Sequence, residues 1–165
     1  ELLKQRYDQI VYTGNTEKAK LILKAAAEHV TPCTLELGGS NPVIVTEDAN
    51  LDEAAYSVAL GRFFNSGQMC IAPEYVLVHE KVKRVFNVKM RQVIEDFFGV
   101  NPQKSTDLGR IVTKEHVERI QALLKNHGGK LEIGGEVNVD EKYVAPTLIS
   151  EPKKTADLVK GEIFG

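Results

Sequence analysis

Short β-rich runs alternate with amphipathic helical patterns along this chain, and no other feature of the sequence constrains the fold as strongly. Such alternation is typical of an α/β domain, in which mostly parallel strands form a layered sheet flanked by helices. We therefore expect that fold class. Strands are expected at 9–13, 34–37, 42–46, 74–79, 130–133 and 143–149, and helices within 19–30, 51–64, 82–97 and 114–124.

Several residues mark the expected ends of these elements. Asn50, followed three positions later by Glu53, resembles a capping box at the start of a helix, and Thr113 is a second N-cap residue. Gly99 is expected to end the helix that precedes it. Pro146 interrupts the last strand, which we therefore expect to be bent or to lie at a sheet edge.

The charge balance of the chain shows no basic excess of the kind that nucleic-acid binding requires. Lys and Arg total 21 against 23 Asp and Glu, a net charge of −2, so we expect no nucleic-acid partner. No stretch approaches the roughly 18 consecutive apolar residues of a membrane helix, so we expect no membrane contact from this segment. The 165 residues correspond to about one domain or to part of a larger protein.

Two cysteines, Cys33 and Cys70, lack the spacing of a disulfide scaffold or a zinc site. The four histidines also lack metal-ligand spacing and fall in or beside amphipathic segments, so we expect no metal site. A reducing, cytoplasmic compartment fits free thiols best, although a membrane anchor beyond Gly165 stays open.

Three short regions carry residues that could do chemistry, and the first is the turn from Gly14 to Ala19. It falls where a strand ends and a helix begins, so backbone N–H groups and the positive end of the helix dipole point outward together. Such a turn suits a phosphate group. An ordinary helix start has the same pattern, and that alternative stays open.

The second region is the strand around Glu36, a carboxylate in an otherwise apolar run that is followed by two glycines. An apolar wall raises the pKa of a carboxylate toward the range of a general base, and glycines let a ligand approach the backbone closely. An edge residue that points its carboxylate into solvent explains the same pattern equally well.

The third region is the polar turn at 65–69, which presents Cys70. A free cysteine is often a small buried hydrophobe, and this interpretation fits Cys33, at the entry to a strand. Cys70 instead has the polar, glycine-containing context of a reactive and partly accessible thiol. No histidine is identifiable as its partner, which disfavours a cysteine hydrolase.

Taken in order, the segments YTGN, LELGGSNP, FFNSGQMCIAP and EIFG resemble the aldehyde dehydrogenase superfamily. The 34-residue step from Glu36 to Cys70 resembles its class 3, fatty-aldehyde-type branch. The resemblance runs from about Gln9 to Gly165. It implies the α/β fold of that family's catalytic domain and a small-molecule aldehyde as the substrate.

The resemblance also implies catalytic roles for two side chains. Cys70 is implied to attack the aldehyde carbonyl as its thiolate, giving a thiohemiacetal from which hydride passes to a nicotinamide. Glu36 is implied to activate the water that hydrolyses the resulting thioester. The backbone N–H of Cys70 is implied to be one donor to the oxyanion, while the family's second donor, an Asn side chain, comes from an upstream segment.

The implied cofactor is NAD or NADP. The turn at Gly14 resembles the family's pyrophosphate-contacting turn, although Asn15 and Ala19 replace its usual Ser and second Gly. Glu162 resembles the residue that takes the nicotinamide ribose hydroxyls, and Gly161 stands where the family often has Glu. The residues implied to bind the cofactor are Gly14, Asn15, Thr16, Ala19, Leu37, Glu162 and Phe164.

The expected division places the end of a nucleotide-binding domain at residues 1–31 and a catalytic thiol domain, truncated at its C-terminus, at 32–165. The full-length enzyme is expected to be a homodimer, and the isolated 165-residue piece to be inactive. A CoA-acylating dehydrogenase and a non-catalytic domain of the same fold are the alternatives. Glu36 argues against the first, and the retention of Cys70 argues against the second.

Overall fold

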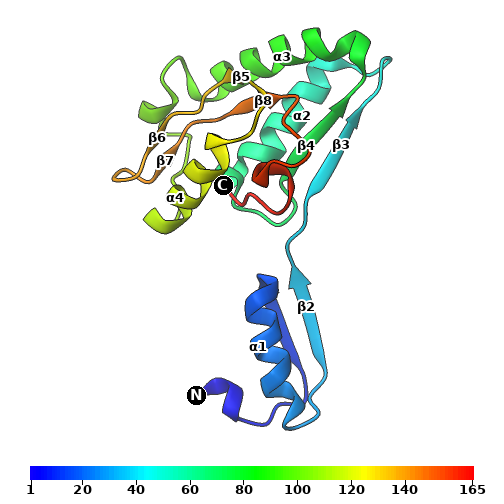
Figure 1. The fold of residues 1–165 in the computed structure, drawn as a ribbon, viewed down its shortest axis with the longest axis vertical. Helices are drawn as coiled ribbons and strands as arrows, with labels where there is room; N and C mark the ends of the chain where they lie inside the picture. Colours follow the sequence, from blue (N-terminus) through cyan, green and yellow to red (C-terminus); the bar gives the residue numbers. More distant parts are fainter. The chain divides into compact units, whose positions relative to one another are not determined.

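The computed structural model describes residues 1–165 and divides into two compact units, Glu1–Gly39 and Ser40–Gly165 (Figure 1). The first unit thus ends eight residues after residue 31, where the nucleotide-binding domain is expected from the sequence to end. The two compact units are defined by backbone contacts and not by function, so the expected domain boundary stays a prediction. Each unit is described below by itself.

The first unit is a β-α-β element. Its two strands pair in parallel, with Ile10 opposite Cys33 and Gly14 opposite Leu37. A helix connects them, as a parallel pair requires, and buries the small side chains of Ala19 and Ala26. The elements are the 3-10 turn η1 (Leu2–Lys4), β1 (Ile10–Gly14), α1 (Thr16–Ala27) and β2 (Cys33–Leu37).

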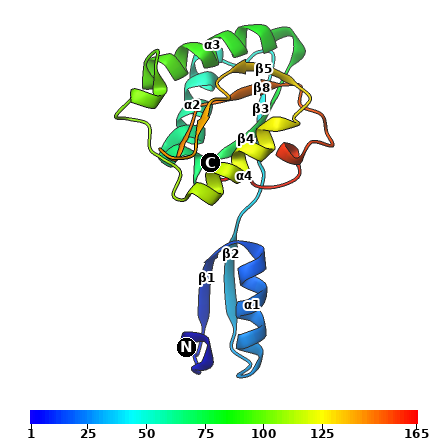
Figure 2. The same ribbon diagram turned by 60° about the vertical axis from the view of Figure 1, so that its left-hand side comes forward.

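The second unit begins with another β-α-β element followed by a long helix. Its two strands are also parallel, and the ladder shifts register between Asn41 and Pro42. α2 and α3 pack against each other, as Figure 2 also shows from a second direction. The elements are β3 (Asn41–Val45), α2 (Leu51–Phe63), the 3-10 turn η2 (Phe64–Gly67), β4 (Pro73–Val78) and α3 (Glu80–Phe98).

The remaining strands are short and pair antiparallel, β5 with β8 and β6 with β7. The α/β class is confirmed, but the parallel arrangement holds only for the two β-α-β elements. The strand expected at 143–149 divides around Pro146, because this residue has no N–H to donate to a ladder. The elements are η3 (Pro102–Lys104), α4 (Lys114–Lys125), β5 (Lys130–Ile133), β6 (Val137–Asn138), β7 (Tyr143–Val144), β8 (Leu148–Ser150) and η4 (Asp157–Val159).

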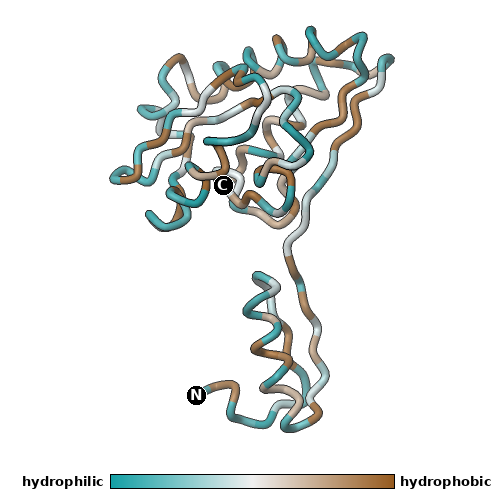
Figure 3. The backbone as a smooth tube through the Cα atoms, in the orientation of Figure 1, coloured by the Kyte–Doolittle hydropathy of each residue, from teal (hydrophilic) through white to brown (hydrophobic).

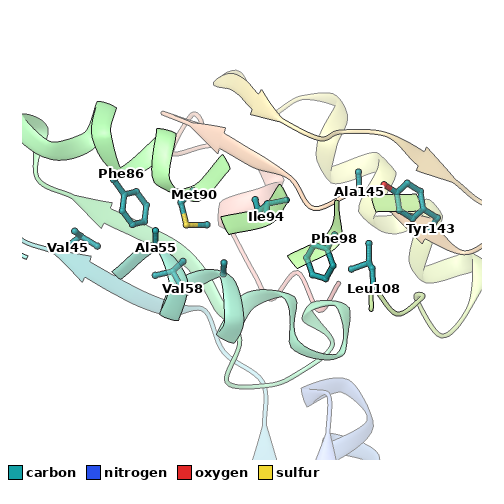
Figure 4. Close-up of a cluster of buried hydrophobic side chains, with 11 residues drawn as sticks. Val45, Ala55, Val58, Phe86, Met90, Ile94, Phe98, Leu108, Tyr143 and Ala145 are labelled. Atoms are coloured by element: carbon teal, nitrogen blue, oxygen red, sulfur yellow. The ribbon is translucent and has the colours of Figure 1, made fainter. Parts of the chain in front are cut away.

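The core of the second unit lies where α3 meets α2 and the strands (Figure 4). One stripe of α3 supplies a residue every fourth position, the spacing that keeps side chains on one face of a helix. Phe98 also contacts Phe63 of α2 edge to face, with ring centroids 5.9 Å apart. The stripe consists of Phe86, Met90, Ile94 and Phe98, all buried.

The expected helix ends are confirmed. Asn50 Oδ1 accepts hydrogen bonds from the backbone N–H groups of Asp52 and Glu53, and Thr113 Oγ1 accepts one from His116. Gly99 ends α3 with a φ of 74°, in the left-handed region that glycine adopts at little cost. Local sequence signals therefore agree with these helix boundaries.

Hydropathy follows the elements rather than forming one continuous apolar block (Figure 3). Hydrophobic stretches run along β3 and β4, whereas the helices alternate between hydrophobic and hydrophilic residues. No helix of the structure combines the length and the apolar character that crossing a membrane requires.

Candidate thiol site and cofactor-binding residues

Cys70 lies in the loop that joins η2 to β4, and its side chain is exposed. Cys33 differs in its surroundings: it begins β2, is half-buried, and its Sγ lies 3.6 Å from the carbonyl oxygen of Thr31 as a weak donor. The side chain of Cys70 is therefore exposed to solvent, whereas that of Cys33 contacts the backbone just before β2. This difference agrees with the sequence interpretation of Cys70 as an accessible thiol and Cys33 as a structural residue.

The turn before Cys70 has an uncommon backbone. Asn65, Ser66 and Gly67 have φ values of 50°, 56° and 75°, three consecutive residues in the left-handed region. This conformation costs non-glycine residues free energy, so the surrounding contacts must hold it in place. The hydroxyl of Ser66 is also buried without a hydrogen-bond partner.

Gln68 connects this turn by hydrogen bonds to residues 110–112, which precede α4. Its Nε2 donates to the carbonyl oxygens of Asn65, at 3.0 Å, and Arg110, at 3.1 Å. Its Oε1 accepts a hydrogen bond from the backbone N–H of Val112 at 2.9 Å. One side chain thus joins two loops that lie more than 40 residues apart in the sequence.

Asn41 forms hydrogen bonds with the C-terminal part of the same loop, at residues 70–72. Its Nδ2 donates to the carbonyl oxygen of Cys70 at 2.8 Å and to that of Ala72 at 3.0 Å. Sequence reasoning missed both Asn41 and Gln68. Gln68 stands in the motif that carries Cys70, which was an available signal, but nothing in the sequence connects Asn41 with residues 70–72.

The backbone N–H of Cys70 donates no hydrogen bond within the chain. A free N–H next to an exposed thiol can stabilise negative charge that develops on a carbonyl oxygen during attack by the sulfur. The local arrangement therefore suits nucleophilic chemistry on a carbonyl compound.

Glu36 lies on the exposed face of β2, where burial alternates from one residue to the next. Of the two interpretations left open for Glu36, the unit that carries it favours the edge residue whose carboxylate points into solvent. β2 pairs only with β1, so Glu36 occupies the solvent-facing side of a two-stranded sheet. The role of Glu36 as a general base stays a prediction.

The turn after β1 is a capped helix start. Asn15 Oδ1 accepts from the N–H of Lys18 at 2.9 Å, and the Asn15 carbonyl accepts from that of Ala19. The N–H groups of Thr16 and Glu17 have no partner and remain available at the positive end of α1. Ala19 is buried, so its methyl group occupies the position where the pyrophosphate-contacting turn that this segment resembles usually has its second glycine.

The segment at 162–165 is held by charged side chains. Arg119, from α4, donates through Nη2 to the carbonyl oxygen of Ile163 at 2.6 Å, and Glu74 accepts from the N–H of Ile163. Arg62, from α2, donates to the carbonyl oxygen of Gly165. Burial raises the pKa of the Glu74 carboxyl and lowers the pKa of Arg119.

The side chain of Glu162 carries a buried acceptor atom that lacks a partner. Its Oε1 is buried and makes no hydrogen bond, which is costly for a carboxylate unless a ligand supplies the donor. The ribose hydroxyls of a dinucleotide are such donors, so Glu162 fits the cofactor role implied for it. Phe164 is half-buried with a φ of 50°, a strained conformation that the same charged residues help to hold.

A cavity of about 760 Å³ lies in the second unit. Consecutive residues of β4 and of the β7–β8 region line it, together with core side chains, whereas Cys70 and Glu162 do not. The thiol side chain is therefore not part of the lining, although Ser66 and Pro73, on either side of its loop, are. No group of three or more His, Cys, Asp or Glu side chains is arranged to hold a metal ion.

Comparisons with known proteins match the whole chain. The family model described as "Aldehyde dehydrogenase family" matches residues 2–165. Aldehyde dehydrogenase family 3 member A2 from Mus musculus is 42% identical over all 165 residues, which cover 34% of that protein. The dimeric NADP-preferring aldehyde dehydrogenase from Canis lupus familiaris is also 42% identical, over the whole chain and 36% of its own length.

A solved structure agrees in fold. The substrate-bound state of AldH from Staphylococcus aureus superimposes with a TM-score of 0.94 and 38% identity, covering 99% of this chain and 36% of that one. The chain therefore spans about a third of the length of the relatives that it matches. These matches confirm the expected resemblance, including the class 3 branch to which the family 3 names correspond.

Proposed function

The chain belongs to the aldehyde dehydrogenase family, and we propose that its full-length protein oxidises an aldehyde to a carboxylic acid with NAD or NADP. The chain covers about a third of its relatives, so the activity is assigned to the whole protein rather than to these 165 residues. The observation that carries the proposal is Cys70, an exposed thiol beside a free backbone N–H.

In the first step, the thiolate of Cys70 attacks the aldehyde carbon and forms a carbon–sulfur bond. The electron pair of the carbonyl moves to its oxygen, where the backbone N–H of Cys70 stabilises the negative charge. A loop held at Gln68 and Asn41 supports this step, because the sulfur and the N–H belong to the same fixed residue.

In the second unit, Glu162 would hold the ribose nearest the nicotinamide and Phe164 would pack beside the ring. In the first unit, the turn from Gly14 to Ala19, with Leu37, would also contact the cofactor. The unpartnered Oε1 of Glu162 and the free N–H groups of Thr16 and Glu17 support this assignment. When bound, NAD or NADP accepts the hydride that leaves the substrate carbon, which leaves an acyl group bound to Cys70 as a thioester.

In the last step, Glu36 takes a proton from the water that attacks the thioester carbon. The carbon–sulfur bond breaks, the acid leaves, and the thiolate of Cys70 is restored. The solvent-facing position of Glu36 on β2 is compatible with access by water.

The test is cofactor-dependent oxidation by the full-length product of the reading frame. Purified protein is incubated with NAD or NADP and a panel of aliphatic and aromatic aldehydes, while the absorbance of the reduced cofactor is followed. We expect turnover that disappears in Cys70→Ala. Product formation only after addition of CoA would support the acylating alternative instead, and no turnover with any aldehyde would contradict the proposal.

The assembly and location of the full-length protein form part of the same proposal. A relative from Canis lupus familiaris is named as dimeric and NADP-preferring, which supports a homodimer and leaves both cofactors open. Free thiols at Cys33 and Cys70 are typical of a reducing compartment such as the cytoplasm. We expect the 165-residue chain alone to show no measurable turnover, because the implied Asn oxyanion donor lies outside it.

A further inference from the structure

The ladder between β3 and β4 is incomplete where it meets the Cys70 loop. Asn41 lies opposite Pro73 and Pro42 lies opposite Tyr75, so Glu74 is the additional residue of a register shift. Pro42 and Pro73 have no N–H to donate. Two of the first residues of this sheet therefore lack a backbone donor that could help to fix the end of the loop.

The side chain of Asn41 supplies donors at this place. Both hydrogens of its Nδ2 are used, one on the carbonyl oxygen of Cys70 at 2.8 Å and one on that of Ala72 at 3.0 Å. Ala72 is buried, so these bonds join the loop to the body of the unit. They fix the peptide group that follows the Cys70 side chain.

Gln68 fixes the other side, two residues before Cys70. It bonds both hydrogens of Nε2 and its Oε1 to backbone groups of Asn65, Arg110 and Val112. The two carboxamides thus hold the flanks of the loop, while the thiol stays exposed and the N–H of Cys70 stays free.

We propose that Asn41 and Gln68 are positioning residues for Cys70, fixing its sulfur and its N–H relative to each other and to the bound aldehyde. The inference rests on the proposed function, since it concerns the attack step. Neither side chain needs to touch the substrate. A nucleophile misplaced by about 1 Å can lose roughly a hundredfold in rate, so the loss of either carboxamide should slow attack strongly.

The test uses Asn41→Asp and Gln68→Glu in the full-length protein, because these variants keep the side-chain shape but remove every donor. The control is Asn87→Ala, which removes another half-buried carboxamide of the same unit, bonded to Ser150 Oγ at 2.9 Å. If Asn41→Asp does not fold, Asn41→Ser, which keeps one O–H donor, is compared with Asn41→Ala, and we expect the serine variant to be the more active.

Three readouts are measured for each variant. We expect kcat for aldehyde oxidation to fall about ten- to a hundredfold, and the KM for the cofactor to stay within about twofold. We expect iodoacetamide to alkylate Cys70 within about threefold of the wild-type rate, because the thiol is already exposed, with Cys33 as the internal reference.

A kcat equal to that of Asn87→Ala would overturn the inference and leave the proposed function intact. A fall in kcat with a parallel rise in the KM for the cofactor would also overturn it, because a general loss of structure moves both. A wild-type protein that oxidises no aldehyde would reject the proposed function and this inference together.

Discussion

Arg119 donates through Nη2 to the carbonyl oxygen of Ile163 at 2.6 Å, a contact between residues 44 positions apart in the chain. The same atom lies 3.4 Å from the carbonyl oxygen of Phe164. Glu162 and Phe164 are the two residues of the segment 162–165 that we propose to bind the cofactor. Arg119 therefore holds the backbone at Ile163 and Phe164, which positions both side chains.

Replacing Arg119 with alanine should weaken cofactor binding by the full-length protein. A hydrogen bond from a charged donor typically contributes enough that its loss costs about tenfold or more in affinity, and we expect a rise of that size in the Kd for NAD or NADP. Isothermal titration measures it. Arg84→Ala is the matched control, because Arg84 is exposed and forms no ion pair or hydrogen bond in the structure. Equal affinity in the two variants would contradict the prediction.

Glu74 should make the stability of the chain depend on pH. Burial raises the pKa of its carboxyl above the ordinary value, so over the interval between the two values the folded chain keeps a proton that the unfolded chain has lost. The stability contributed by Glu74 therefore falls as pH rises through that interval. Glu74→Gln keeps an acceptor for Ile163 and cannot ionise.

We expect the free energy of unfolding of Glu74→Gln to increase relative to wild type as pH rises above 4.5, the ordinary pKa of this carboxyl, toward its raised value. Urea denaturation of both proteins at each pH measures this difference. A difference that stays constant, or that decreases with pH, would show that the carboxyl does not titrate in this way.

The two cysteines should respond differently to substitution. Cys70→Ser should abolish nearly all oxidation, because a serine hydroxyl lacks the nucleophilicity of a thiolate. Cys33→Ser should keep most of the activity, since Cys33 only begins β2 and contacts Thr31. Steady-state rates of aldehyde oxidation by the two variants test this prediction. Comparable losses of activity in both would show that Cys70 is not the nucleophile.

Glu36→Gln should separate the two halves of the reaction. The amide keeps the shape of the side chain but cannot take a proton from water, so the thioester should form and then persist. Rapid mixing should show one equivalent of reduced cofactor released quickly, followed by a stalled phase. A slow linear trace without the early phase would place Glu36 outside the deacylation step.

Local signals in the sequence correctly predicted those features of the fold that depend on a single helix: its ends and its buried face. The caps at Asn50 and Thr113, the glycine at the end of α3 and the periodic stripe from Phe86 to Phe98 all act within one element. The antiparallel pairing of β5 with β8 was not predictable in this way, because strand direction depends on partners 15 to 20 residues away rather than on the strand's own residues.

The candidate site shows the same distinction. The exposure of Cys70 could be predicted from the polar turn beside it, since that context is local. The contacts of Asn41 with Cys70 and of Arg119 with Ile163 join residues 29 and 44 positions apart, and no periodicity or cap reports them. The sequence left two interpretations of Glu36 open for a related reason: residue types along a strand do not reveal which face of the strand a neighbouring element covers.

The most direct test of the account is the identity of the residue that carries the acyl group. Full-length Glu36→Gln protein is mixed with an aldehyde and NAD or NADP, quenched in acid, digested and analysed by mass spectrometry. The account predicts an acyl thioester on the peptide that contains Cys70, which requires the cofactor and is absent from the peptide that contains Cys33. Oxidation of the aldehyde with the acyl group on any other residue, or with no covalent adduct at all, would contradict it.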